Sequence, residues 1–173
     1  MRKSFYVMAG MAFILTLSSC GVVQQSLSVL QDVAMDTSTT LGEVQQADPQ
    51  FVANVTSCRR QGNDVLLTFN VRNNTGQTLQ DVRIGHTGYY ENMEGRTDVG
   101  QEISSMVTSI AVRGGNWDGI ARFDMPAGSV KTLQIYIKDV ATNARNISLQ
   151  VGMGCENKTF ANKKARFTLV PIQ

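Results

Sequence analysis

The amino-acid sequence predicts an all-β domain, an antiparallel β-sandwich of about eight strands, over residues 51–173. From Phe51 onward the apolar residues recur with a period of two, which is typical of half-buried strands. Pro49, Pro126 and Pro171 all lie at the edges of these runs, where a missing N–H breaks no ladder bond. No helical period follows residue 50, which favours a sandwich or barrel.

The alternating runs justify the strands one by one. The clearest strand covers 65–71, where Val65, Leu67, Phe69 and Val71 alternate with Leu66, Thr68, Asn70 and Arg72. An earlier run begins at Phe51, and the turn residues of 73–76 end the second strand. The remaining expected strands lie at 82–84, 106–112, 121–125, 133–137, 147–153 and 165–169.

The first twenty residues have the order of a secretory signal. Arg2 and Lys3 precede an apolar run from Phe5 to Leu17, and small residues lead to Cys20. The alternative is a membrane-spanning helix, but the run is shorter than the roughly 20 residues that such a helix needs. The stretch Leu17-Ser-Ser-Cys20 resembles the lipobox of bacterial lipoproteins. That resemblance implies that the Cys20 thiol is acylated and that the chain is cut just before it.

The expected organisation is a signal peptide at 1–19, a lipidated tether and linker at 20–50, and the sandwich at 51–173. Within the tether two alternatives stay open, a helix with one apolar stripe or a loosely ordered stalk. The stripe would be formed by Val23, Leu27, Leu30 and Ala34. The small and polar stretch at 36–50 is expected to be the linker.

The charge balance gives no support to nucleic-acid binding. The chain has 16 basic and 14 acidic residues, and loss of Arg2 and Lys3 with the signal makes the two numbers equal. The expected partners are the membrane, through the lipid, and an unknown protein or glycan. Because Gly21 rather than Asp follows the cysteine, the resemblance to lipoproteins favours the outer membrane. No acidic run that resembles a surface-export signal follows Cys20, which favours the side that faces the periplasm.

The chain has three cysteines, and lipidation of Cys20 would leave Cys58 and Cys155. Disulfides persist outside the cytoplasm, so the simplest expectation is a bond between these two. The alternative is two free buried thiols. Two cysteines and one histidine, His86, make a poor zinc site.

The stretch from Val65 to the turn Asn73-Asn-Thr-Gly76 resembles the strand-and-turn pattern of immunoglobulin-like and fibronectin-like bacterial domains. The resemblance covers roughly residues 50–173 and implies an Ig-like sandwich. The sequence departs from antibody domains, because Trp117 lies in a glycine-rich stretch rather than in a strand between paired cysteines.

Two loops are candidates for binding. Residues 85–101 make a long connection that carries tyrosines, which give a large contact area at low entropic cost. The candidate contact residues are Arg59, Arg60, His86, Tyr89, Tyr90 and Glu91. The alternative is a surface loop whose tyrosines cover the core. In the second loop, an exposed Trp117 would indicate sugar or protein contact, but we expect Trp117 instead to plug the open end of the sandwich.

If successive strands alternate in direction, Cys58 and Cys155 lie at one end of the sandwich. The 85–101 loop then shares that end, and Trp117 and the linker at Pro49 lie at the other. The sequence has no catalytic or phosphate-binding motif and indicates no cofactor or metal. We therefore expect a non-enzymatic, lipid-anchored binding module of the cell envelope. The alternative is an assembly subunit that pairs through strand edges or sheet faces.

Overall fold

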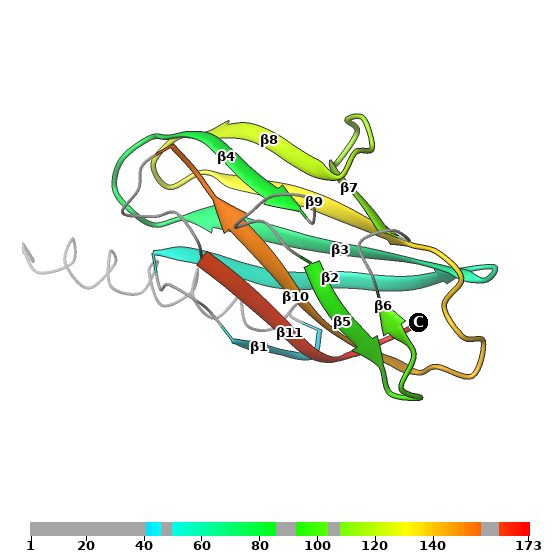
Figure 1. Cartoon of the computed structure of the whole chain (residues 1–173). Helices are drawn as coiled ribbons and strands as arrows, with labels where there is room; N and C mark the ends of the chain where they lie inside the picture. The colour runs from blue at the N-terminus through cyan, green and yellow to red at the C-terminus, as the bar shows by residue number, and fades with distance from the viewer. Residues whose placement is uncertain (1–40, 46–49, 86–92, 104–107, 157–162) are drawn as a thin grey trace, which may run out of the picture. The chain divides into compact units, whose positions relative to one another are not determined.

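The computed structural model describes residues 41–45, 50–85, 93–103, 108–156 and 163–173, which form an antiparallel β-sandwich (Figure 1). One layer is a four-stranded sheet whose neighbours, in order, are β2 (Phe51–Gln61), β3 (Asp64–Asn73), β9 (Val130–Ile137) and β7 (Thr108–Val112). The other layer has seven strands. Its main path runs through β1 (Glu43–Gln45), β11 (Lys163–Pro171), β10 (Asn146–Gly154), β4 (Leu79–Gly85) and β8 (Ile120–Met125). The predicted all-β sandwich is confirmed.

All eight expected strands are present, and three more lie in stretches that were expected to be linker or loop. β1 pairs with β11, inside the range given to the linker, so the folded part begins before Phe51. β5 (Met93–Thr97) pairs with β10 and with β6 (Glu102–Ile103). The expectation of one continuous loop over 85–101 is therefore wrong. Backbone N–H and C=O groups gain hydrogen bonds when a segment pairs with an unpaired sheet edge. A short polar segment can therefore form a strand although its sequence shows no apolar period of two.

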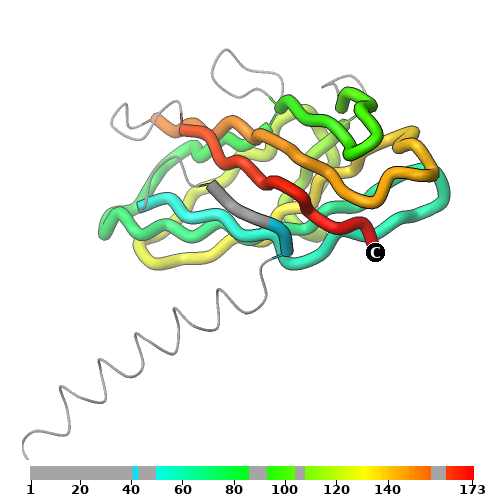
Figure 2. Tube along the Cα trace, turned by 90° about the horizontal axis from the view of Figure 1, so that it is seen from below, coloured from blue at the N-terminus to red at the C-terminus, as the bar shows by residue number. Residues whose placement is uncertain are grey.

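The core lies between the two sheets and follows the predicted alternation. In β3 the side chains of Val65, Leu67, Phe69 and Val71 are at most 1% exposed, while their neighbours are half-buried on the outer face. The Phe69 ring meets the Phe167 ring of the opposite sheet, with centroids 5.3 Å apart. Figure 2 shows the two layers from another side, with β10 and β11 in one and β2, β3 and β9 in the other.

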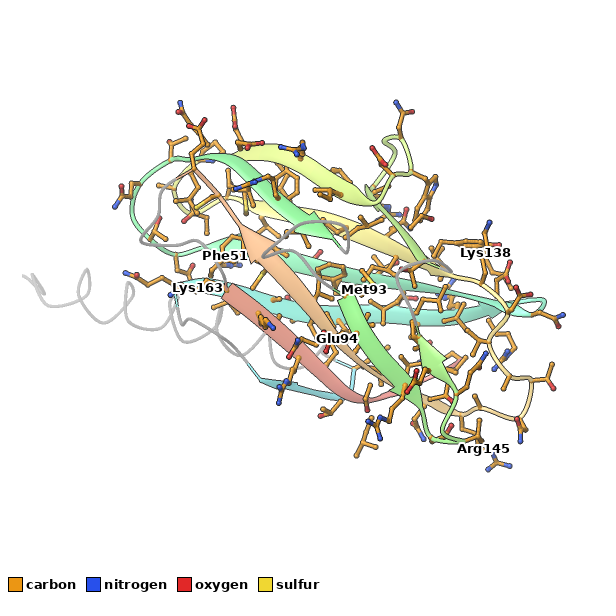
Figure 3. The ribbon with its side chains drawn as sticks, viewed as in Figure 1. Phe51, Met93, Glu94, Lys138, Arg145 and Lys163 are labelled. Carbon is orange, nitrogen blue, oxygen red and sulfur yellow. The ribbon has the colours of Figure 1, made fainter. Side chains whose placement is uncertain are left out.

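The strand directions define two ends of the sandwich. The Asn73 end holds Asn73, Phe51 and Leu79, because Asn74 N–H donates to Gln50 O at 2.6 Å and Leu79 pairs with Met125. The Asp64 end holds the β2–β3 turn and the end of β9, where Val140 N–H donates to Asn63 O at 2.7 Å. In Figure 3, Phe51 and Lys163 are labelled toward the first end and Lys138 and Arg145 toward the second.

Successive strands do not alternate in direction throughout. β7 begins beside Ile137 at the Asp64 end, and β8 begins beside Gly85, the end of β4 farther from Asn73. Both strands therefore run toward the Asn73 end, in different sheets. The strand count used for the sequence prediction fails at this crossing. Its placement of Trp117 and of Cys155 is therefore wrong, whereas the linker enters beside Gln50 at the Asn73 end, as predicted.

Candidate binding surface around Trp117 and Tyr136

The predicted Cys58–Cys155 disulfide is absent: neither cysteine is in a disulfide bond, and both are buried. Cys58 pairs with Leu67 in the Asp64 half of β2. Cys155 follows β10 at the Asn73 end, where Glu156 N–H donates to Gln80 O at 3.3 Å. The prediction is wrong because β10 runs in the same direction as β8 and so carries its last residue away from Cys58. Burial raises the pKa of the Cys58 thiol to about 12, against a lowering by Arg60, so this thiol is an unreactive core group.

Arg59 and Arg60, two predicted contact residues, have different surroundings. Arg59 is exposed on the outer face of β2. The Arg60 guanidinium turns to the β9–β10 connection, where it donates to the carbonyl oxygens of Val140, Ala141 and Ala144, each at 3.0 Å. Arg60 is therefore a structural residue, and the prediction that it contacts a partner is not supported by its position.

His86, Tyr89, Tyr90 and Glu91, the remaining predicted contact residues, lie outside the described residues, so their role stays a prediction. The residues that flank them are described. Gly85 pairs with Gly152 and Met93 pairs with Val151, so β4 and β5 follow one another along the same edge of β10. Gly85 and Met93 therefore occupy neighbouring register positions on β10.

Trp117 is 45% exposed, so the expectation that it plugs an end of the sandwich is wrong. Its neighbour Asp118 exchanges two backbone hydrogen bonds with Ile110, at 2.8 and 3.0 Å, which places the loop on the free side of β7. The Trp117 ring nevertheless meets the Tyr136 ring on β9, edge to face, with centroids 5.9 Å apart. Because β7 lies between, the indole has to cross β7.

The outer face of β7 permits that crossing because its side chains are small. Ser109 and Ala111 lie on the outer face of β7, opposite the face that carries the core residue Ile110. Ala111 is only 2% exposed, although it is not part of the core cluster. A covering group on the outer face accounts for this burial. Trp117 therefore covers the outer face of an edge strand and keeps nearly half of its own surface in solvent.

Tyr136 is held in place from its far side. Its hydroxyl donates to Asp64 Oδ2 at 2.5 Å, and Asp64 Oδ1 accepts from Asp139 N–H at 2.9 Å. The Tyr136 hydrogen bond and the Asp139 amide lower the pKa of Asp64, and the same Asp64 hydrogen bond raises the pKa of Tyr136. Asp139 has a φ of 53°, a conformation that non-glycine residues adopt uncommonly. Asp64 thus fixes the ring against which Trp117 packs.

The strand register continues this contact across the four-stranded sheet. Tyr136 pairs with Leu66, and Leu66 pairs with Arg59, so the three side chains form one outward-facing row. In the next outward row Gln134 pairs with Thr68. We call the set Trp117, Tyr136, Leu66, Arg59, Gln134 and Thr68 the Trp117 surface. Arg59 is its one formally charged member.

The two loops selected from the sequence meet at their described ends, although the strand count had placed them at opposite ends. Gly85 pairs with Ile120, and a Cβ atom on Gly85 would stand 2.3 Å from the Gly119 carbonyl oxygen. Gly85 precedes the stretch with the tyrosines, and Gly119 follows Trp117 by two residues. A glycine is required here because two backbones approach more closely than any side chain permits.

The outer face of the seven-stranded sheet has a different chemistry. A shallow hollow over β5, β10 and β11 is bordered by side chains of both signs, Glu94, Arg96, Glu102 and Arg166. Arg166 Nε donates to Gln150 Oε1 at 2.9 Å. Among the described residues, no group of three or more His, Cys, Asp or Glu side chains is placed to hold a metal ion. The described part also contains no helix long and apolar enough to cross a membrane.

Comparisons with known proteins add little to this geometry. No family model matches the chain, and no curated protein matches it. A solved family 123 glycoside hydrolase from Clostridium perfringens is 10% identical with a TM-score of 0.41 over 70% of this chain. The chain spans 27% of that enzyme. The Salmonella enterica trimeric lipoprotein SadB is 11% identical with a TM-score of 0.39, over 80% of this chain and 74% of SadB. Likenesses this weak carry no conclusion about family or activity.

Sequence reasoning missed Tyr136 and Asp64 and favoured the wrong role for Trp117, that of a plug at the end of the sandwich. The signal for Tyr136 was present, because it alternates with Leu133, Ile135 and Ile137 and so had to face outward. An aromatic ring on the solvent side of a strand is a candidate for a binding site, because exposed apolar surface often marks one. Its hydrogen bond to Asp64 joins residues 72 positions apart and left no local pattern in the sequence.

Proposed function

We propose that this chain is a lipid-anchored, non-catalytic binding module of the bacterial cell envelope, and that its recognition surface is the Trp117 surface. One observation carries the proposal. The indole of Trp117 is 45% exposed while it is held against Tyr136 on a regular sheet. Binding sites combine such a large apolar surface with a rigid support, because little conformational entropy is then lost on binding.

The anchor rests on the signal pattern that ends at Cys20. Several acyl chains hold a protein stably on a membrane where one does not. We place the module in the envelope, on the periplasmic side of the outer membrane, since Gly21 follows the cysteine. Cys20→Ala should abolish labelling with radioactive palmitate and release the protein from the membrane fraction. Labelling that persists in this variant would contradict the anchor.

The alternative function, assembly through strand edges or sheet faces, has less support at the two edges of the four-stranded sheet. The edge of β2 is covered where Arg60 N–H donates to Gln173 O at 2.8 Å and Gln173 N–H donates to Cys58 O at 2.9 Å. The edge of β7 is covered at Ile110 by the loop that carries Trp117. Covered edges cannot accept a strand from another chain.

The binding role is tested by cross-linking in living cells. A photo-reactive amino acid replaces Asn116, the exposed neighbour of Trp117, and in a matched strain it replaces Val99, which is 46% exposed elsewhere. We expect an adduct from position 116 that is absent from position 99 and is lost on Trp117→Ala. The proposal fails if position 116 gives no adduct and nothing copurifies from mild detergent in a Trp117-dependent manner.

A further inference from the structure

Resting on that proposed function, we infer that the ligand of the Trp117 surface is a neutral polysaccharide, a chain of hexopyranose units lying across β7, β9, β3 and β2. A pyranose ring has an apolar C–H face and a rim of hydroxyl groups. It therefore needs an exposed aromatic face beside uncharged groups that both donate and accept hydrogen bonds. The Trp117 surface supplies both requirements on adjacent rows of one sheet.

The aromatic part is offered in a fixed orientation. Trp117 packs edge to face on Tyr136, so the two rings are inclined by 64°. Asp64 holds the Tyr136 hydroxyl at 2.5 Å from the side opposite to the solvent-exposed indole. A ring held in this way loses little freedom when a ligand stacks on it, and aromatic stacking favours apolar faces over charged groups.

The polar part is neutral. Gln134 and Thr68 pair directly in the row beside Tyr136, and an amide and a hydroxyl can each donate and accept. One row further on, the Thr132 hydroxyl donates to Asn70 Oδ1 at 2.9 Å. The opposite outer face carries Glu94, Arg96, Glu102 and Arg166. That contrast favours an uncharged ligand on the Trp117 surface, because this surface offers a charged peptide a single formal charge, Arg59, whereas the other face offers ions of both signs.

The length of the surface favours a chain over a single sugar. Its aromatic row passes from β7 across β9 and β3 to Arg59 on β2. Neighbouring strands lie about 4.8 Å apart, so these three steps span roughly 14 Å. Leu66 offers a further apolar contact in the middle, and the Arg59 guanidinium offers donors for hydroxyl groups at the far end.

The experiment uses the only tryptophan of the chain as its reporter. The full-length processed protein is extracted in mild detergent. Its fluorescence and its quenching by iodide are followed while soluble β-glucan, dextran, galactomannan or sonicated peptidoglycan sacculi are added. We expect at least one of the three neutral polysaccharides to protect Trp117 from iodide in a saturable manner. A ring that served only to cover β7 would show no such protection.

Variants are compared by electrophoresis in native gels that contain the protecting probe. Trp117→Ala should weaken binding at least about tenfold, since truncation of a central aromatic contact usually costs that much. Gln134→Ala should weaken it less. Leu169→Ala and Gln80→Ala, which alter an exposed apolar and an exposed amide side chain elsewhere, should migrate like the wild type.

The outcomes separate this inference from the proposed function. If no probe protects Trp117, or if Trp117→Ala binds the protecting probe as the wild type does, the polysaccharide inference is overturned. A protein adduct from position 116 without protection by any polysaccharide would overturn the inference and leave the binding role standing. Protection by sacculi but by none of the three neutral polysaccharides would overturn the inference, because peptidoglycan carries charged peptide stems, and would leave the binding role standing.

Discussion

The Asn73 end and the Trp117 surface both carry amide and hydroxyl groups on the four-stranded sheet, but they use them in opposite ways. At the Asn73 end the amide is fully buried. Asn73 Nδ2 lies within hydrogen-bond distance of the carbonyls of Gln77, Met125 and Pro126, and Asn73 Oδ1 accepts from Thr75 at 2.6 Å. On the Trp117 surface Gln134 and Thr68 stay half-buried at the solvent side.

The difference indicates which region stabilises the fold and which is available to a ligand. A buried polar group whose partners are all inside the protein closes a loop and excludes water, and its loss leaves orphaned carbonyls. A half-exposed group exchanges water for ligand at little cost. Substitutions at the Asn73 end should therefore change stability, while those on the Trp117 surface should change binding.

Asn73→Ala should have the largest effect on the free energy of unfolding. It removes the shared donor of three carbonyl oxygens from a site that is 0% exposed, and we expect a loss of about 3 kcal/mol. Asn74→Ala, its exposed neighbour, should cost less than about 0.5 kcal/mol. Urea denaturation of the two variants checks this. Equal losses in both would mean that the amide network is not what holds this end.

Gly85→Ala should come next, because it forces apart the point where the two selected loops meet. The new Cβ would stand 2.3 Å from Gly119 O and 2.8 Å from Ile120 Cα, and neither backbone atom can turn aside. We expect about 2 kcal/mol of destabilisation, together with a shift in Trp117 fluorescence. Gly115→Ala, in the exposed part of the Trp117 loop, is the control. A stable Gly85→Ala protein with unchanged fluorescence would contradict the close approach.

Arg60→Met and Arg59→Met sharpen the comparison within two adjacent residues. Arg60→Met keeps the apolar stem but loses three hydrogen bonds to the β9–β10 connection, and we expect about 1.5 kcal/mol of destabilisation. Arg59→Met should leave stability within about 0.5 kcal/mol of the wild type and weaken ligand binding. Thermal melts and native gels measure the two effects. The assignment is wrong if the two variants exchange roles.

The smallest effect on the free energy of unfolding should come from the hydrogen-bonded pair of Asp64 and Tyr136. The Tyr136 hydrogen bond and the Asp139 amide lower the folded-state pKa of Asp64 below 3.8. This contribution to stability is present above the unfolded-state pKa and is lost as pH falls through the folded-state value. The pKa of Tyr136 is raised above 10.0 by the same Asp64 bond, so that contribution is lost as pH rises beyond 10.0.

Asp64→Asn should therefore flatten the acid limb of the stability profile, and Tyr136→Phe the alkaline limb. Urea midpoints between about pH 2 and about pH 11 measure both limbs. The shifts should be small because the pair stands at the surface. If the stability profiles of both variants follow that of the wild type, the hydrogen bond from Tyr136 to Asp64 does not hold the Tyr136 ring in place.

Features that depend on neighbouring residues could be predicted from the sequence, and features that depend on contacts between distant residues could not. The period of two in Val65 to Val71 identified a strand and its inner face, since alternation is a property of neighbouring residues. β1 and β5 left no such period, because their pairing partners, not their own side chains, make them strands. Trp117 was noticed, but its exposure depended on the small outer face of β7.

The sequence by itself determined the eight alternating strands, their buried faces and the signal pattern before Cys20, all of which depend on local order and spacing. Only the tertiary structure decided that β7 and β8 run the same way, and with that the separation of Cys58 from Cys155 and the meeting of Gly85 with Gly119. The direction of a strand after a crossing between sheets depends on which edge is free to receive it. That is a property of the assembled sandwich and of no single segment.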